Sequence, residues 1–285
     1  MPEAVLVDLL ASAGEALDAP LCTRILVMLA PGAEVDEGTL CAVLNTGGRL
    51  RSPALVEAAW ARLEARAARG RLLTSATWAA KLAACARCGD LEGAFRTLTH
   101  LPGAPATTLE PLVAACHELD ESYYTLERMH AAGEVVTVEA VNAVVYACVR
   151  AVDVRRAFET FDSMEALGVR ANLTTFNALL EACLWQATGA AQVEAEMSAR
   201  GITGDATTAS LLVDNLLRER QLPRALERAE ISGGIHPSTL GRLLRYASMF
   251  GDTAQAGRAR ALGAVDDSAS QERPPWWRMM EPAKV

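Results

Sequence analysis

LTTFNALLEAC, from Leu173 to Cys183, repeats in outline an earlier stretch of the chain, VEAVNAVVYAC, from Val138 to Cys148. Each stretch has an Asn at its fifth place and ends in an Ala-Cys pair. The same pair closes two more short apolar stretches, at Ala84-Cys85 and Ala115-Cys116. The pairs recur at spacings of 31 to 35 residues, and a recurrence of this length is typical of helical-repeat proteins.

A second helical stretch follows each Ala-Cys pair after about ten residues and contains a pair of small or aromatic residues. These pairs are Ala94-Phe95, Tyr123-Tyr124, Ala157-Phe158 and Ala190-Ala191, with similar marks at Ala59-Trp60 and Ala225-Leu226. Two helices per unit form a hairpin that buries its apolar face only by stacking on its neighbours. The small residues, Cys included, are expected where paired helices approach closely.

The composition indicates an all-helical chain. It also argues against a strongly basic surface for binding nucleic acids. Of the 285 residues 51% are apolar but only 5% aromatic, and long stretches such as ALVEAAWARLEARAA have helical spacing without strand-like alternation. The formal net charge is −8, whereas non-specific nucleic-acid binding depends on Lys and Arg. Any RNA binding is therefore expected to be local.

The sequence also bears on the cellular setting. Charges, Pro or Gly interrupt every apolar run before it could span a bilayer, so no membrane partner is expected. Seven cysteines without a secreted-type spacing indicate a reducing compartment. The first residues, MPEAVLVDLL, resemble neither a signal peptide nor a transit peptide.

The turns fit the repeat. Gly168, Gly201 and Gly234 each follow a second helix, where a left-handed residue is expected. The polar residues that close the linkers are expected to cap the next helix; they are Asn172, Asp205 and Ser238.

These residues resemble the pentatricopeptide repeat, whose unit begins like VTYNxLI, has a Gly-Asp-Leu-type turn and a Met late in the second helix, and closes with Gly-Ile-x-Pro-Asp. The closest copies are Val138–Asn172 and Leu173–Asp205, with a weaker one at Ala206–Ser238. The matching residues include Phe176-Asn177, Met164, Met197, and Cys88-Gly89-Asp90-Leu91 followed by Ala94-Phe95. The main competitor, the tetratricopeptide repeat, has a Trp, Leu-Gly, Tyr pattern that is not visible here.

The resemblance implies an all-α fold, a right-handed α-solenoid of about seven helix-turn-helix repeats. We expect degenerate N-terminal hairpins over residues 1–73, the repeat array over 74–263, and an extended tail containing Pro and Trp over 264–285.

The resemblance also implies RNA contacts, because in this family a first-helix residue and the last residue of the unit together read one base. Carried over, the pairs are Asn142 with Asn172, Asn177 with Asp205, and Ser210 with Ser238. By family resemblance the first two pairs would favour pyrimidines.

The sequence also contains candidate residues for a zinc site and for a catalytic site. Cys85, Cys88, Cys116 and His117 could bind zinc, but the repeat already places Cys85 and Cys116 in the core, so no metal is expected. The histidines (His100, His117, His130 and His236) accompany no nucleophile motif and no Gly-rich phosphate loop. We therefore expect no catalysis, no cofactor and no small-molecule substrate, and a structural role for His236.

The tail breaks the repeat and contains Trp276, Trp277, Met279 and Met280. These apolar side chains are expected either to fold back on the last repeat or to contact a partner.

The expected function is that of a non-catalytic helical-repeat protein of organellar gene expression. It would bind single-stranded or ribosomal RNA and protein subunits in a ribonucleoprotein such as the mitochondrial ribosome, with a plastid as the alternative compartment. A stand-alone RNA processing or translation factor and a purely protein-binding scaffold remain open.

Overall fold

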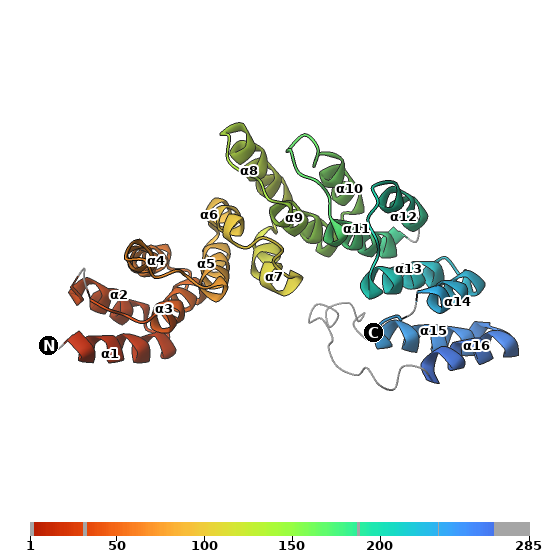
Figure 1. Cartoon of the computed structure of the whole chain (residues 1–285), viewed down its shortest axis with the longest axis horizontal. Helices are drawn as coiled ribbons and strands as arrows, with labels where there is room; N and C mark the ends of the chain where they lie inside the picture. Colours follow the sequence, from red (N-terminus) through yellow and green to blue (C-terminus); the bar gives the residue numbers. More distant parts are fainter. Residues whose placement is uncertain (1–2, 31–32, 187–188, 233, 265–285) are drawn as a thin grey trace. The chain divides into compact units, whose positions relative to one another are not determined.

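A computed structural model describes residues 3–30, 33–186, 189–232 and 234–264 of the chain (Figure 1). These ranges contain α-helices and one short 3-10 helix, and no strand. The helices are α1 (Glu3–Glu15), α2 (Ala19–Met28), α3 (Glu37–Arg49), α4 (Pro53–Ala68), α5 (Ser75–Cys88), α6 (Leu91–Thr97), η1 (Leu98–His100), α7 (Ala106–Ala115), α8 (Leu119–Ala131), α9 (Val138–Arg150), α10 (Val154–Asp162), α11 (Leu173–Gln186), α12 (Ala190–Ala199), α13 (Ala206–Arg218), α14 (Leu222–Ile231), α15 (Pro237–Phe250) and α16 (Thr253–Ala264).

The helices alternate along the chain as first and second members of hairpins, and they form two compact units. Unit 1 comprises residues 1–147 with 167–169, and unit 2 comprises residues 148–166 and 170–285, so the boundary falls inside α9.

In unit 1 each hairpin packs on the next, as Figure 1 shows from α1 to α8. The first helices contact one another in sequence (α1 with α3, α3 with α5, α5 with α7), and the second helices do so at α2 with α4 and α6 with α8. A Cβ on Gly48 of α3 would lie 2.8 Å from the Cα of Ala84 of α5. The backbones of these two helices therefore approach so closely that only glycine fits.

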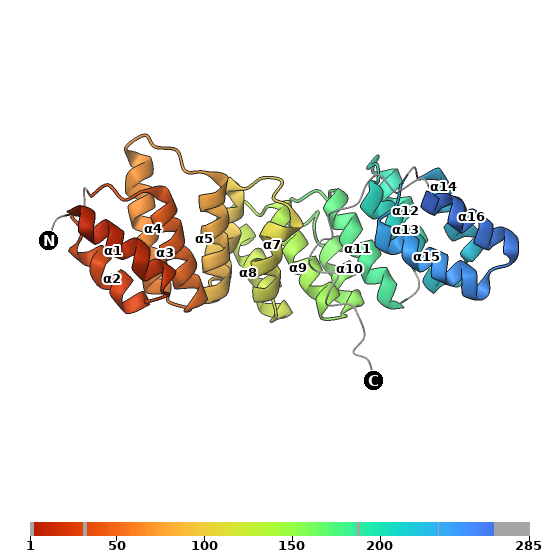
Figure 2. The same cartoon turned by 90° about the horizontal axis from the view of Figure 1, so that it is seen from below.

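Unit 2 follows the same plan. The first helices α11, α13 and α15 contact one another in sequence, and α14 contacts α16 (Figure 2). Its last two hairpins share one core cluster, in which Val213, Ala225, Leu226 and Leu243 are fully buried. Each hairpin thus supplies one wall of a core that its neighbour completes.

The all-helical repeat fold is confirmed, with eight hairpins in the described ranges where about seven were expected. The cysteines of the Ala-Cys pairs, Cys85, Cys116, Cys148 and Cys183, are all buried. Among the described helices, none has the length and apolarity that crossing a bilayer requires.

The predicted turn glycines are right in two cases of three. Gly168 and Gly201 each have φ of 70°. Gly234 does not adopt a positive φ, because α14 already ends at Ile231 with Ser232 as its C-cap residue.

Candidate functional site

The residues singled out in the first helices occupy equivalent places. Asn142, Asn177 and Ser210 are each the fifth residue of their helix, in α9, α11 and α13. Because residues four apart in a helix share a face, the ninth and thirteenth residues lie in line with the fifth. All three side chains are buried, with exposed fractions of 1%, 8% and 1%.

Asn177 is engaged with the start of the next repeat. Its Oδ1 accepts a hydrogen bond from Thr208 Oγ1 at 2.7 Å, and its Nδ2 lies 3.5 Å from Asp205 Oδ1. Asp205 in turn accepts a hydrogen bond from Thr208 N at 2.8 Å and caps α13 in a capping box. The structure therefore brings Asn177 and Asp205 together, in a contact between α11 and α13.

Asn172 also caps a helix, since its Oδ1 accepts a hydrogen bond from Thr175 N at 3.1 Å at the start of α11. Thr175 Oγ1 accepts the hydrogen bond from Asn172 N in return, also at 3.1 Å. Asn142 belongs to unit 1 and Asn172 to unit 2.

Ser210 is paired with His236 and not with Ser238. Its Oγ accepts a hydrogen bond from His236 N at 2.8 Å and donates one to Ala206 O at 2.7 Å. His236 is the N-cap residue of α15, which begins at Pro237. The expectation that Ser238 caps this helix is therefore wrong: proline at the first helical position starts the helix two residues earlier, and Ser238 lies exposed in its first turn.

Acidic residues stand at the ninth place of two first helices in unit 2. Burial raises the pKa of Glu181 in α11 to about 8, and the nearby charge of Arg150 opposes this only in part. In α13 the equivalent residue, Asp214, accepts hydrogen bonds from Arg242 Nε at 2.8 Å and Thr239 Oγ1 at 3.0 Å. One acid is thus kept neutral near pH 7, and the other is matched by an arginine.

Arginine stands at the thirteenth place of four first helices, and the sequence analysis did not single it out. These residues are Arg49 in α3, Arg87 in α5, Arg150 in α9 and Arg218 in α13. All four are exposed, and Arg49, Arg87 and Arg218 have no ion-pair or hydrogen-bond partner among the described residues. The repeated offset within the helices is the signal that could have identified them.

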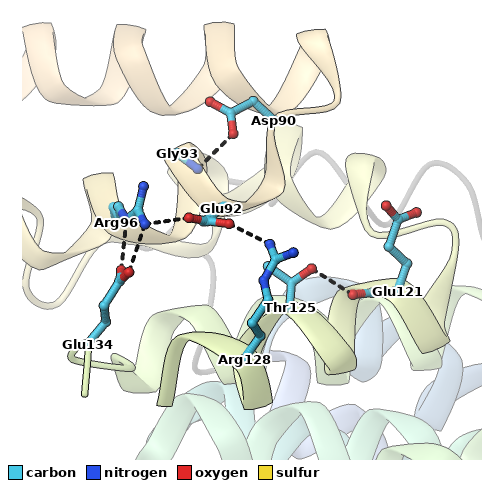
Figure 3. Close-up of polar contacts among 8 residues, drawn as sticks. All are labelled: Asp90, Glu92, Gly93, Arg96, Glu121, Thr125, Arg128 and Glu134. Atoms are coloured by element: carbon cyan, nitrogen blue, oxygen red, sulfur yellow. Dashed lines mark hydrogen bonds and ion pairs between the residues drawn. The ribbon is translucent and has the colours of Figure 1, made fainter. Parts of the chain in front are cut away.

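Arginines of the second helices, in contrast, are largely paired. In unit 1 Arg96 of α6 donates to Glu134 at 2.7 Å through both Nε and Nη2, and it also pairs with Glu92 (Figure 3). Glu92 is shared with Arg128 of α8, so the network joins successive hairpins. These bonds lower the pKa of Glu134.

Unit 2 repeats this arrangement at each step from one second helix to the next. Arg258 of α16 pairs with Glu230 of α14 at 2.7 Å, and Arg228 of α14 pairs with Glu194 of α12. Arg200 lies 3.9 Å from Glu165, after α10. The arginines that join successive second helices are therefore compensated by carboxylates, whereas the exposed first-helix arginines Arg49, Arg87 and Arg218 have no such partner among the described residues.

The remaining candidates from the sequence are the metal ligands and the tail residues. Within the described ranges, no three His, Cys, Asp or Glu side chains come together as metal ligands. Burial raises the pKa of the Cys85 thiol to about 12, with the charge of Asp90 adding to the effect, as expected of a core thiol. Trp276, Trp277, Met279 and Met280 lie outside the described residues.

Comparison with known proteins decides between the repeat classes. The family model for pentatricopeptide repeat-containing proteins matches residues 37–164. A mitochondrial pentatricopeptide repeat-containing protein of Arabidopsis thaliana is 34% identical in an alignment of 239 residues, gaps included, that covers 74% of this chain and 38% of that protein. The chain belongs to the pentatricopeptide repeat family. It spans well under half the length of this curated relative.

Solved structures of pentatricopeptide repeat proteins are also similar to the chain. The pentatricopeptide repeat protein PPR10 in complex with an 18-nt psaJ RNA element is 20% identical, with 93% of this chain and 33% of that chain covered and a TM-score of 0.37. The repeat domain of Arabidopsis thaliana protein-only RNase P 1 in complex with tRNA is 17% identical, with 61% and 95% covered and a TM-score of 0.46.

Proposed function

We propose that this pentatricopeptide repeat protein binds single-stranded RNA along its first helices, without catalysis of its own. The observation that carries the proposal is the uncompensated arginine at the thirteenth place of the first helices, at Arg49, Arg87 and Arg218. Affinity for RNA follows the number of phosphates that such cations neutralise. In this proposal the arginines contact phosphates, and the pairs Asn142 with Asn172, Asn177 with Asp205, and Ser210 with Ser238 contact bases.

An RNA partner is supported by the two similar pentatricopeptide repeat proteins, each of which was solved in complex with RNA. The relative's description as mitochondrial supports a mitochondrial location, with a plastid as the alternative. The net charge of −8 favours action inside a ribonucleoprotein over free RNA binding, because protein subunits can then share the contact with RNA. A mitochondrial ribosome is the assembly proposed.

The test is the salt dependence of binding to a single-stranded oligoribonucleotide by the triple variant Arg49→Gln, Arg87→Gln, Arg218→Gln. Three lost phosphate contacts should lower the slope of log K against log salt by about 2. The matched control replaces Arg24, Arg224 and Arg260, exposed residues of second helices, with Gln. Equal slopes for both triple variants would refute the proposed interface.

The assembly is tested separately by sedimentation of the native protein from organelle extract. Migration with a large particle that ribonuclease disperses is expected. Migration as a small free species, with RNA binding intact in the first test, would favour a stand-alone RNA-binding factor.

A further inference from the structure

A cavity in unit 1 is lined by four arginines at the end of α4 and just beyond it. Arg62, Arg66, Arg69 and Arg71 face the segment Ala33–Val35, which precedes α3. The cavity has a volume of about 20 Å³ and is partly open to solvent. It has room for one group the size of a water molecule, such as one oxygen of a tetrahedral anion whose remaining atoms stay in the open mouth.

Arg62 is fixed in place by the end of α2. Its Nη1 donates to Ala30 O at 2.6 Å, and its Nη2 donates to Leu29 O at 2.7 Å and to Leu26 O at 2.8 Å. Leu26 and Leu29 belong to the C-terminus of α2, where helix carbonyls lack intrahelical partners, and Ala30 O also accepts a hydrogen bond from Ala33 N at 2.9 Å. The guanidinium is therefore held without a carboxylate. Its positive charge at the cavity wall is therefore not compensated by this contact.

Arg66 has a donor that no described residue accepts. Its Nη1 donates to Val35 O at 3.3 Å, but its Nε is buried and has no acceptor in the described part of the chain. Buried donors in folded proteins nearly always have a partner, and a buried N–H of a charged group is particularly unfavourable without one. Arg228 Nε is the other buried arginine donor without an acceptor among the described residues, so the orphaned Nε supports an anion site only together with the arginine lining of this cavity.

The carboxylates of Glu34, Asp36 and Glu37 offset part of the charge of the four arginines, which leaves a small excess of positive charge at the cavity. Glu34 lines the cavity but pairs with Arg71 at 2.7 Å, and both side chains are exposed. Asp36 accepts hydrogen bonds from Thr39. Hydrogen bonds from Thr77 and Thr74 lower the pKa of Glu37, and the charge of Arg66 adds to this effect.

We propose that the arginine cavity of unit 1 binds a phosphate group, either inorganic phosphate or the terminal phosphate of an RNA. Guanidinium groups match the geometry of phosphate oxygens and can bind them in pairs. The site lies on the second helix of its hairpin, away from the first-helix arginines, so the proposal goes beyond the proposed function and does not depend on it.

The test titrates the full chain with three probes: inorganic phosphate, a short 5′-phosphorylated oligoribonucleotide, and the same oligoribonucleotide with a 5′-hydroxyl. The NMR signal of the Arg66 Nε–H, assigned by its loss in Arg66→Lys, should shift on binding. The double variant Arg69→Gln, Arg71→Gln should weaken binding about tenfold. Both residues are exposed, so this variant should fold normally.

Binding of inorganic phosphate as tight as that of the phosphorylated oligoribonucleotide identifies a free anion as the ligand. A preference for the phosphorylated over the hydroxyl oligoribonucleotide identifies an RNA terminus. No shift of the Arg66 signal with any probe, or equal affinity in the double variant, overturns the proposal. The matched control, Arg155→Gln with Arg224→Gln, should leave phosphate binding unchanged, as should the triple variant of the first helices.

Discussion

Glu181 is a carboxyl group that the fold keeps protonated. Burial raises its pKa to about 8 in the folded chain, and an unfolded Glu titrates near about 4.3. Between these values the folded state holds a proton that the unfolded state has released. The free energy of unfolding should therefore fall as pH rises through this window, and the contribution should be constant above about pH 8.

Glu181→Gln should remove this dependence, because an amide remains neutral at every pH. At pH 9 we expect the variant to be more stable than the wild type by about 5 kcal/mol, and near pH 4 by almost nothing. Urea unfolding between pH 4 and pH 9 measures the difference. Glu227→Gln, an exposed residue of α14, is the control, and parallel pH curves for wild type and Glu181→Gln would contradict the prediction.

Asp214 and Arg242 form the corresponding charged contact between α13 and α15. Arg242→Met leaves Asp214, which is 5% exposed, with Thr239 as its remaining side-chain donor. Breaking a buried pair by removing one partner is costly, and we expect a loss of about 3 kcal/mol in the free energy of unfolding. Arg258→Met breaks an exposed pair and should have a much smaller effect, so equal losses in denaturant unfolding would refute this prediction.

At the scale of the element, helix starts are set by short polar residues. Asp205 caps α13 and also lies beside Asn177, so Asp205→Ala should cost about 1 kcal/mol from the cap. Because the two residues share Thr208, Asp205→Ala and Asn177→Ala should be non-additive in a double-mutant cycle. Asp252→Ala, which removes a hydrogen bond to Gln255 N at the start of α16, should combine additively with Asn177→Ala.

The sequence pattern was sufficient to predict the helices and their pairing into hairpins, but it did not predict the exact residues at which the helices begin and end. The Ala-Cys period placed Cys148 and Cys183 in the core, because a small apolar residue at a fixed helical phase has few other environments. It misplaced the cap of α15, where the preference of Pro237 for the first helical position outweighed the analogy with Asn172 and Asp205.

The candidate site was less predictable than the fold. The period located Asn177 and Ser210 at equivalent places, but their burial depends on how tightly the next hairpin packs, which no local pattern records. The neutral state of Glu181 is likewise a result of tertiary packing. The arginines at the thirteenth place were visible in the sequence, yet only their lack of partners separates them from the paired arginines of the second helices.

At the scale of the whole molecule, the seven thiols are distributed over both units, and each can report on its own surroundings. Burial raises the pKa of Cys148 and Cys183 to about 11, whereas Cys41 and Cys88 are only partly buried. The thiolate is the reactive form, so reaction requires both access and ionisation.

Pulse labelling of the native protein with a thiol reagent at pH 8 should therefore modify Cys41 and Cys88 first. The labelling rates of Cys148 and Cys183 should be lower by a factor of about a hundred or more, because these thiols become accessible only as unit 2 opens. Mass spectrometry of the labelled peptides gives the rate at each site. Equal native rates at Cys88 and Cys183 would contradict the described packing, and labelling in urea, where all seven should react alike, is the control.

The hydrogen bonds that occupy Asn177 have a kinetic consequence for recognition. A base that contacts this amide must first break its bond to Thr208, and to reach Ser210 it must displace His236. Association would then be limited by a local opening of the protein instead of by diffusion, and complexes would form slowly in the cold and much faster on warming. The incubation time and the temperature of a binding assay would then determine whether it detects complex formation with RNA.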